Sequence, residues 1–174
     1  MRLFPANPVE PGKLKLSVAL WPNTAGWIVS IKHQITRAAE LEALQVFRDF
    51  IASACQTHSG IDAQTRYDLQ LAADEACTNI MTHGYAGLNP GSIILALELE
   101  PWRVVMTITD FGHAFEPSET PMPDPGAALE DRPTGGFGLY FIYQTMDEVD
   151  YKTDDTSNQL ILVKKLRSVA GEEP

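Results

Sequence analysis

Hydrophobic residues recur every three to four positions between residues 36 and 56, which predicts an amphipathic helix. Thr36 is placed to cap the start of this helix. Upstream, alternating hydrophobic positions predict a strand at residues 27–31 and a short strand at residues 14–20. The inward face of the helix is predicted to consist of Leu44, Phe47, Ile51 and Ala54.

The same spacing returns at residues 69–85 and predicts a second helix, which Asp62 can cap. Glu75, Asn79 and His83 follow one another at intervals of four, so a neighbouring face carries a carboxylate, an amide and an imidazole in one row. Taken alone, this row fits a solvated helix face as well as a site for a metal ion or polar ligand. The apolar stripe consists of Leu69, Ala73, Ala76 and Ile80.

Alternating hydrophobic positions predict strands in the second half of the chain. The first two are joined by a turn that is too short for a parallel crossover, so we expect an antiparallel hairpin. A helical pattern begins at Leu139, directly after a glycine-rich segment. The predicted strands span residues 93–99, 104–109, 148–153 and 159–166.

Composition narrows the class of protein. The chain has 174 residues, of which 44 % are hydrophobic, as is typical of one globular domain with a sizeable core. We divide it into an N-terminal extension of unknown role at residues 1–26, a domain at residues 27–167 and a tail at residues 168–174. The formal net charge of −10 argues against broad nucleic-acid binding and against anionic membrane surfaces.

The two cysteines indicate the compartment. Cys55 and Cys77 lie in helical patterns, far from any metal-binding spacing, so we expect buried free thiols and a reducing environment. No run approaches the roughly 18 apolar residues of a membrane span, and we find no export signal. We therefore expect a cytoplasmic protein.

Two further segments carry candidate chemistry. Asp110 ends a predicted strand before Gly112, which is a common turn, but Asp110 could also accept a hydrogen bond from an exocyclic amine while Gly112 lets a flat ring approach. Residues 116–134 are proline-rich and have the length of lids, binding loops or disordered segments. They lead into glycines at positions 135, 136 and 138 that open a helix, a pattern that suits phosphate binding but also a tight connection.

The order of these features resembles the N, G1 and G2 boxes of the ATPase superfamily shared by sensor histidine kinases, gyrase-type topoisomerases, mismatch-repair ATPases and heat-shock chaperones. More narrowly, residues 27–166 resemble the bacterial anti-sigma-factor serine/threonine kinases. Ala114 replaces a glycine that many superfamily members have, a change that this branch tolerates. The matching segments are residues 75–79 (EACTN), 83–85 (HGY), 110–115 (DFGHAF), 135–139 (GGFGL) and 146–149 (MDEV).

The resemblance implies an α/β (α+β) sandwich of the Bergerat type, with helices on one face of a mixed, mostly antiparallel sheet and a long lid over ATP. Asn79 would hold Mg²⁺, which bridges the phosphates, and Glu75 would act as general base on an incoming hydroxyl. Asp110 would accept from the adenine amine, and His83 would either contact phosphate or only end its helix. The remaining implied nucleotide contacts are Gly112, Phe115, Arg132, Thr134, Gly135, Gly136, Phe137, Gly138 and Leu139.

On this resemblance we predict an MgATP-dependent protein serine/threonine kinase that is also an anti-sigma factor. It would sequester a sigma factor and phosphorylate a small antagonist protein, and a homodimer is implied by the likeness alone. No dimerisation helix pair with a phospho-accepting histidine is visible, which argues against a complete sensor histidine kinase. Two alternatives stay open: a nucleotide-gated binding module without catalysis, and a structural domain that binds no nucleotide.

Overall fold

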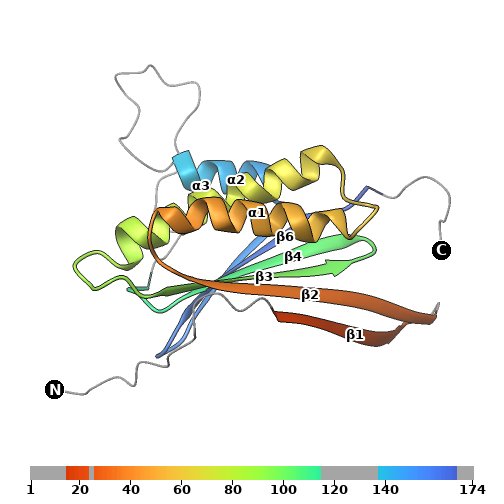
Figure 1. Cartoon of the computed structure of the whole chain (residues 1–174), viewed down its shortest axis with the longest axis horizontal. Helices are drawn as coiled ribbons and strands as arrows, with labels where there is room; N and C mark the ends of the chain where they lie inside the picture. Colours follow the sequence, from red (N-terminus) through yellow and green to blue (C-terminus); the bar gives the residue numbers. More distant parts are fainter. Residues whose placement is uncertain (1–14, 24–25, 115–136, 168–174) are drawn as a thin grey trace.

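A computed structural model describes residues 15–23, 26–114 and 137–167, in which three α-helices pack on one face of a six-stranded sheet (Figure 1). The strand order is β1-β2-β3-β4-β6-β5. The α+β architecture is confirmed, but every described strand pair is antiparallel, so the expected mixed character is not found among them. The elements are β1 (Lys15–Asn23), β2 (Gly26–Ala38), α1 (Glu42–Gln56), α2 (Ala63–Asn79), the π-helix η1 (Ile80–Gly84), β3 (Ser92–Glu100), β4 (Arg103–Asp110), α3 (Phe137–Thr145), β5 (Glu148–Thr153) and β6 (Asn158–Lys165).

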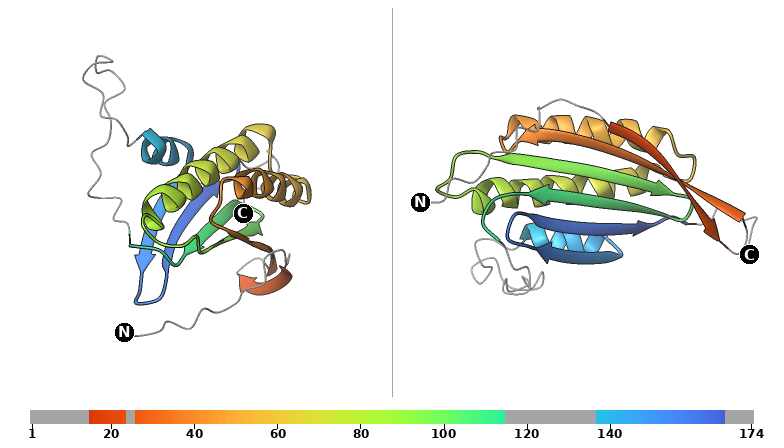
Figure 2. Two further views of the ribbon diagram at one scale, coloured as in Figure 1. Left: turned by 60° about the vertical axis from the view of Figure 1, so that its left-hand side comes forward. Right: turned by 90° about the horizontal axis from the view of Figure 1, so that it is seen from below.

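The core lies between the helices and alternate residues of β3 and β4. Helices α1 and α2 lie on the same face of the sheet (Figure 2). Side chains on a strand point to opposite faces in turn, so one row from each strand is buried in the core between sheet and helices. Full burial of one large apolar side chain contributes roughly 1.5–3 kcal/mol to folding. The side chains of this row are at most 1 % exposed, and they are Ile93, Leu95, Leu97, Leu99, Val104, Met106 and Ile108.

The first helix begins later than its sequence pattern predicted. Thr36 does not cap α1 but lies within β2, where it pairs with Ile94 of β3 and is 3 % exposed. The helix instead starts after Leu41, without a side-chain cap. Thr36 is β-branched and suits a strand as well as a cap, and its pairing with a strand almost 60 residues away in the chain decides the outcome.

The second helix is built as predicted at its start and differs at its end. Asp62 caps α2 by accepting a hydrogen bond from the Thr65 N–H at 2.7 Å. After Asn79 the helix widens into η1, in which the Tyr85 N–H reaches back five residues to the Ile80 carbonyl at 3.0 Å. Such π-turns are rare and occur preferentially at functional sites.

Lys164, near the end of β6, contacts both α2 and α3. Lys164 forms an ion pair with Asp68 of α2, with Nζ and Oδ2 2.7 Å apart, and donates to the Thr145 carbonyl at the end of α3 at 2.6 Å. Lys165 and Arg167, by contrast, are exposed. A single ammonium group therefore joins β6, α2 and α3.

The two edge strands of the sheet are β1 and β5. The predicted strand near residue 14 is confirmed as β1, an edge strand on which Leu16 and Val18 are exposed. The opposite edge, β5, carries exposed charged residues.

Among the described residues, no helix combines the length and the apolar character needed to cross a bilayer. Cys55 and Cys77 are buried free thiols, as expected.

Candidate functional site

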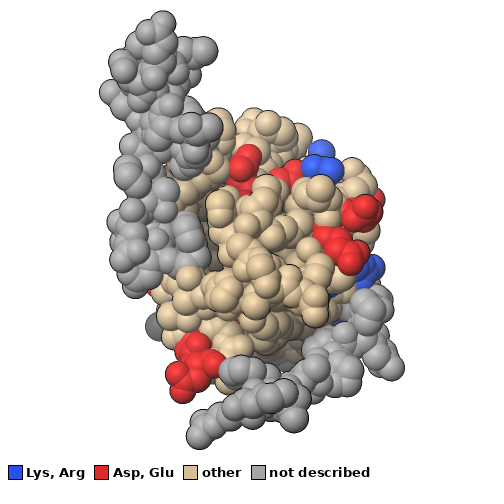
Figure 3. Space-filling view, turned by 90° about the vertical axis from the view of Figure 1, so that its left-hand side faces the viewer, with Lys and Arg blue, Asp and Glu red and all other residues tan. Residues whose placement is uncertain are grey.

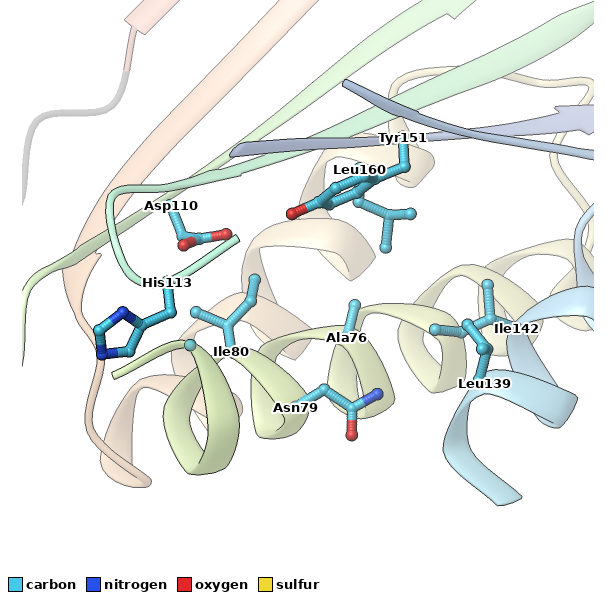
Figure 4. A pocket seen from close by; sticks show the side chains of 10 residues that line it. Ala76, Asn79, Ile80, Asp110, His113, Leu139, Ile142, Tyr151 and Leu160 are labelled. Atoms are coloured by element: carbon cyan, nitrogen blue, oxygen red, sulfur yellow. The ribbon is translucent and has the colours of Figure 1, made fainter. Parts of the chain in front are cut away.

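A pocket opens between the helical layer and one end of the sheet (Figure 4). It is walled by α2 and η1 on one side, by α3 on another, and by the ends of β4, β5 and β6. Its lining is mostly apolar, with a few polar groups that converge on the same space, which is typical of small-molecule sites. The lining residues are Ala76, Asn79, Ile80, Gly84, Asp110, His113, Leu139, Ile142, Tyr151 and Leu160.

Asp110 supplies the buried carboxylate of this pocket. The side chain is 6 % exposed, and its Oδ1 accepts hydrogen bonds from the Gly112 N–H at 2.9 Å and from Asn158 Nδ2 at 3.0 Å. No described residue donates a hydrogen bond to Oδ2. Burial raises the pKa of Asp110, and the two hydrogen bonds act in the opposite direction. Among the described residues, the carboxylate therefore has one oxygen that accepts no hydrogen bond, in a largely apolar pocket that Tyr151 also lines (Figure 4).

Gly112 allows another group to approach its backbone closely, and in the structure that group is the backbone of Gly84. A Cβ at this position would lie 2.3 Å from the Gly84 carbonyl oxygen, and the His113 N–H donates to that same oxygen at 2.7 Å. The missing side chain thus lets the turn after β4 pack directly on the end of η1. This requirement differs from the one we inferred from sequence, and contact between Gly112 and a flat ring stays a prediction.

The predicted row on α2 meets the start of α3. A Cβ at Gly138 would lie 2.6 Å from Glu75 Oε2 and 3.6 Å from Asn79 Nδ2, so the third motif packs against the first. Neither the Glu75 nor the Asn79 side chain forms a hydrogen bond with a described residue. Burial raises the pKa of Glu75, and the neighbouring Asp74 carboxylate raises it further. A raised pKa brings a carboxylate closer to the range in which a general base is effective.

His83 takes a different place from the one that α-helical spacing implied. The row of Glu75 and Asn79 would continue to position 83 in an α-helix, but η1 changes the turn, and His83 is exposed and not part of the pocket lining. The histidine that does line the pocket is His113. Whether His83 contacts phosphate stays a prediction.

The other predicted site residues fall into two groups. Leu139 is buried and lines the pocket, and Phe137 is the first residue of α3. The second group lies outside the described residues and consists of Phe115, Arg132, Thr134, Gly135 and Gly136.

Sequence reasoning missed several pocket residues. Tyr151 and Leu160 come from β5 and β6, where their alternating pattern predicted strands but no ligand contact. Ile142 lies in α3, where the helical pattern that begins at Leu139 predicted a helix but no ligand contact. For Asn158, the turn-like sequence before β6 concealed a residue that is 3 % exposed and bonded to Asp110. The pairing of β4 with β6 brings Asn158 and Leu160 to this end of β4, and the pairing of β6 with β5 brings Tyr151 beside Leu160.

The described side chains would suit a magnesium ion that is also coordinated by phosphates. They suit less well a metal ion that is coordinated by protein side chains alone. Within the described ranges, no three His, Cys, Asp or Glu residues are grouped as a metal cage. Mg²⁺ prefers oxygen ligands and keeps several waters, so a single amide oxygen such as that of Asn79, which lines the pocket, would be a sufficient protein contribution.

Positive charge is scarce at this site. No Lys or Arg among the described residues lines the pocket. Figure 3 views the end of the molecule that carries η1, and in it the described Lys and Arg residues lie only in the right-hand half while Asp and Glu occur at several places. A polyphosphate bound here would need its charge neutralised by a metal ion, by backbone amides or by groups outside the described ranges.

Comparison with known proteins agrees with this geometry. A family model described as a histidine kinase-like ATPase domain matches residues 37–164, from the end of β2 to β6. The serine/threonine-protein kinase BtrW of Bordetella bronchiseptica is 34 % identical over 100 residues, which cover 58 % of this chain and 70 % of the relative. The serine-protein kinase RsbW of Halalkalibacterium halodurans is 32 % identical over 117 residues (61 % and 70 %), and RsbW of Bacillus velezensis is 26 % identical over 134 residues (71 % and 81 %).

Proposed function

The chain belongs to the histidine kinase-like ATPase family, and on this premise we propose that it is an MgATP-dependent protein serine/threonine kinase that acts as an anti-sigma factor. The observation that carries the proposal is one pocket that is lined by both Asp110, whose Oδ2 accepts from no described residue, and Asn79, which lies one helical turn from Glu75 on α2. The relatives supply the reaction class, since they are named serine/threonine- or serine-protein kinases.

The base of ATP would lie at the sheet end of the pocket, where Asp110 of β4 and Leu160 of β6 line it. Its exocyclic amine is a donor, and Asp110 Oδ2 is the matching acceptor. Apolar side chains of Ile80, Leu139 and Leu160 would cover the faces of a flat ring. The phosphates would then extend along α2 toward Glu75 and the start of α3.

The chemistry would take place beside Glu75. The hydroxyl of a substrate Ser or Thr gives its proton to a Glu75 carboxylate oxygen while its own oxygen attacks the γ-phosphorus. The bond between that phosphorus and the β–γ bridging oxygen breaks, and ADP leaves. Asn79 would hold Mg²⁺, which when bound neutralises the negative charge on the phosphate oxygens.

The partners follow from the same family likeness. We expect a small antagonist protein as phospho-acceptor and a sigma factor as the sequestered partner, with a homodimer as the kinase form. We place the protein in the cytoplasm, where the buried thiols Cys55 and Cys77 stay reduced.

Incubation with γ-labelled ATP, Mg²⁺ and a candidate antagonist tests the proposal. We expect label on a Ser or Thr of the antagonist, and Glu75→Ala should lower the transfer rate about 10²- to 10⁴-fold because the general base is lost. Glu42→Ala, at an exposed position on α1, is the control. Transfer that survives Glu75→Ala unchanged would contradict the assigned base. Tight ATP binding without transfer by the wild type would indicate the nucleotide-gated regulator instead.

A further inference from the structure

Asn158 is the most fully bonded polar side chain at the pocket, although it is not part of the lining. It is the first residue of β6 and pairs directly with Asp110 of β4. Its side chain is 3 % exposed. Nδ2 donates toward three acceptors, namely Asp110 Oδ1 at 3.0 Å, the Gly112 carbonyl at 3.2 Å and the His113 carbonyl at 3.3 Å.

The other end of the Asn158 amide is also held. Its Oδ1 accepts a hydrogen bond from the Thr153 hydroxyl at 2.8 Å, so the acceptor end faces a donor and the donor end faces acceptors. A rotation of the amide by half a turn would place its oxygen against three other oxygens. The network therefore allows one orientation of Asn158, and that orientation points the amide N–H groups at the turn that carries Asp110.

This contact decides which Asp110 oxygen is available to a ligand. Oδ1 already accepts from Asn158 and from the Gly112 N–H, so further donors find only Oδ2. We propose that Asn158 is a positioning residue for base selection, which holds Asp110 so that Oδ2 presents a single acceptor to the exocyclic amine of a purine. The inference rests on the proposed function, because it assumes that a nucleotide base occupies the pocket.

The charge state of Asp110 depends on the same contact. The Asn158 hydrogen bond lowers the pKa of Asp110 against the effect of burial, so its loss should raise that pKa. A protonated carboxyl would then be a donor at Oδ2 over a wider pH range and would no longer accept from an amine. The other titratable groups around Asp110 are Cys77 of α2, Tyr85 after η1, and His113 and Tyr151 in the pocket lining.

The test compares ATP with purine riboside triphosphate, which lacks only the exocyclic amine. We expect wild-type protein to bind ATP about ten- to one-hundredfold more tightly, as a hydrogen bond to a charged acceptor allows. Asn158→Ala and the isosteric Asn158→Asp should bring this ratio close to one while the affinity for purine riboside triphosphate changes little. In Asn158→Ala, the weakening of ATP binding as pH falls should also begin at a higher pH than in the wild type.

Two variants are used so that a folding defect in one does not decide the result, and binding of purine riboside triphosphate shows that the pocket is intact. Asn89→Asp, which adds the same charge in an exposed loop, should keep the wild-type ratio. An unchanged ratio in a variant that still binds the analogue would overturn the role of Asn158, and so would an equal loss of affinity for both nucleotides. A wild-type protein that binds neither nucleotide would instead overturn the proposed function itself.

Discussion

The two ends of the pocket are built in different ways. At the sheet end, Asp110 is buried and held by Asn158 and by the backbone of Gly112. At the helix end, the Glu75 and Asn79 side chains have no hydrogen-bonding partner among the described residues. The sheet end is therefore held by hydrogen bonds within the protein, whereas on the proposed function the polar groups of the helix end would be available for phosphate, metal and substrate.

The difference matches what the proposed function would require of each end. A base is recognised by a fixed donor and acceptor pattern, and buried acceptors keep their position when every other lone pair is satisfied. A general base must change partners during the reaction, so permanent hydrogen bonds would oppose its function. Recognition and catalysis thus make opposite demands on the side chains of one pocket.

The largest expected effect comes from filling the contact at the sheet end. In Gly112→Ala, the new Cβ would meet the Gly84 backbone at 2.3 Å, and backbone on both sides cannot move away cheaply. We expect a loss of about 2–3 kcal/mol in unfolding free energy, measured by urea denaturation. Gly84→Ala is the matched control, because its Cβ would find no atom closer than 3.7 Å. Equal stability of the two variants would show that the sheet end is not rigid.

A substitution at Asp110 should separate recognition from stability. In Asp110→Asn, the remaining oxygen can still accept from Asn158 and Gly112, but an NH₂ group replaces the open acceptor. We expect ATP to bind about ten- to one-hundredfold more weakly. Because burial raises the pKa of Asp110, the ionised group opposes folding at neutral pH, so the neutral variant should be more stable by about 1 kcal/mol. Calorimetry measures the ATP affinity and thermal denaturation measures the stability. An unchanged ATP affinity would show that Asp110 does not take part in base recognition.

At the helix end, added bulk should impair catalysis without destabilising the fold. The Cβ of Gly138→Ala would lie 2.6 Å from Glu75 Oε2, the free end of a flexible side chain that can move aside. We expect the rate of phosphoryl transfer to fall about tenfold because Glu75 is displaced, with ATP affinity little changed and stability within about 0.5 kcal/mol. A stability loss as large as that of Gly112→Ala would show that both ends are equally rigid.

The smallest effect concerns the pH dependence of transfer. Glu75 must be ionised to act as a base, so activity should fall as pH decreases through its raised pKa. Asp74 contributes to that increase, so Asp74→Asn should move the acidic limb of the pH–rate profile to lower pH by less than about one unit. Asp49→Asn, which removes an exposed negative charge from α1, should leave the profile unchanged. A shift to higher pH in Asp74→Asn would contradict this account.

The elements that depend on local pattern were predictable from the sequence. Asp62 caps α2 as expected, and the hairpin of β3 and β4 follows from alternation and a short turn. The motif order also indicated that Asp110 and Asn79 would share a site. The cap and the hairpin depend on residues that are close in the sequence, whereas the shared site was indicated by the family motifs.

What the sequence could not show depends on distant pairing. Thr36 joins β2 because of its register with β3, and Asn158 reaches Asp110 because β6 lies beside β4. Lys164 is partly buried because Asp68 and the end of α3 happen to meet there. A pattern of hydrophobic and polar positions carries no information about which strand becomes the neighbour of which.

The Lys164 contact has a mechanical consequence. It anchors the last carbonyl of α3 to the sheet, while the first turn of that nine-residue helix rests on Glu75. With a rise of about 1.5 Å per residue, a tilt of about 10° around the anchored end moves the far end by roughly 2 Å. On the proposed function, a tilt of this size would be enough to change the contact between the start of α3 and Glu75, the proposed proton acceptor.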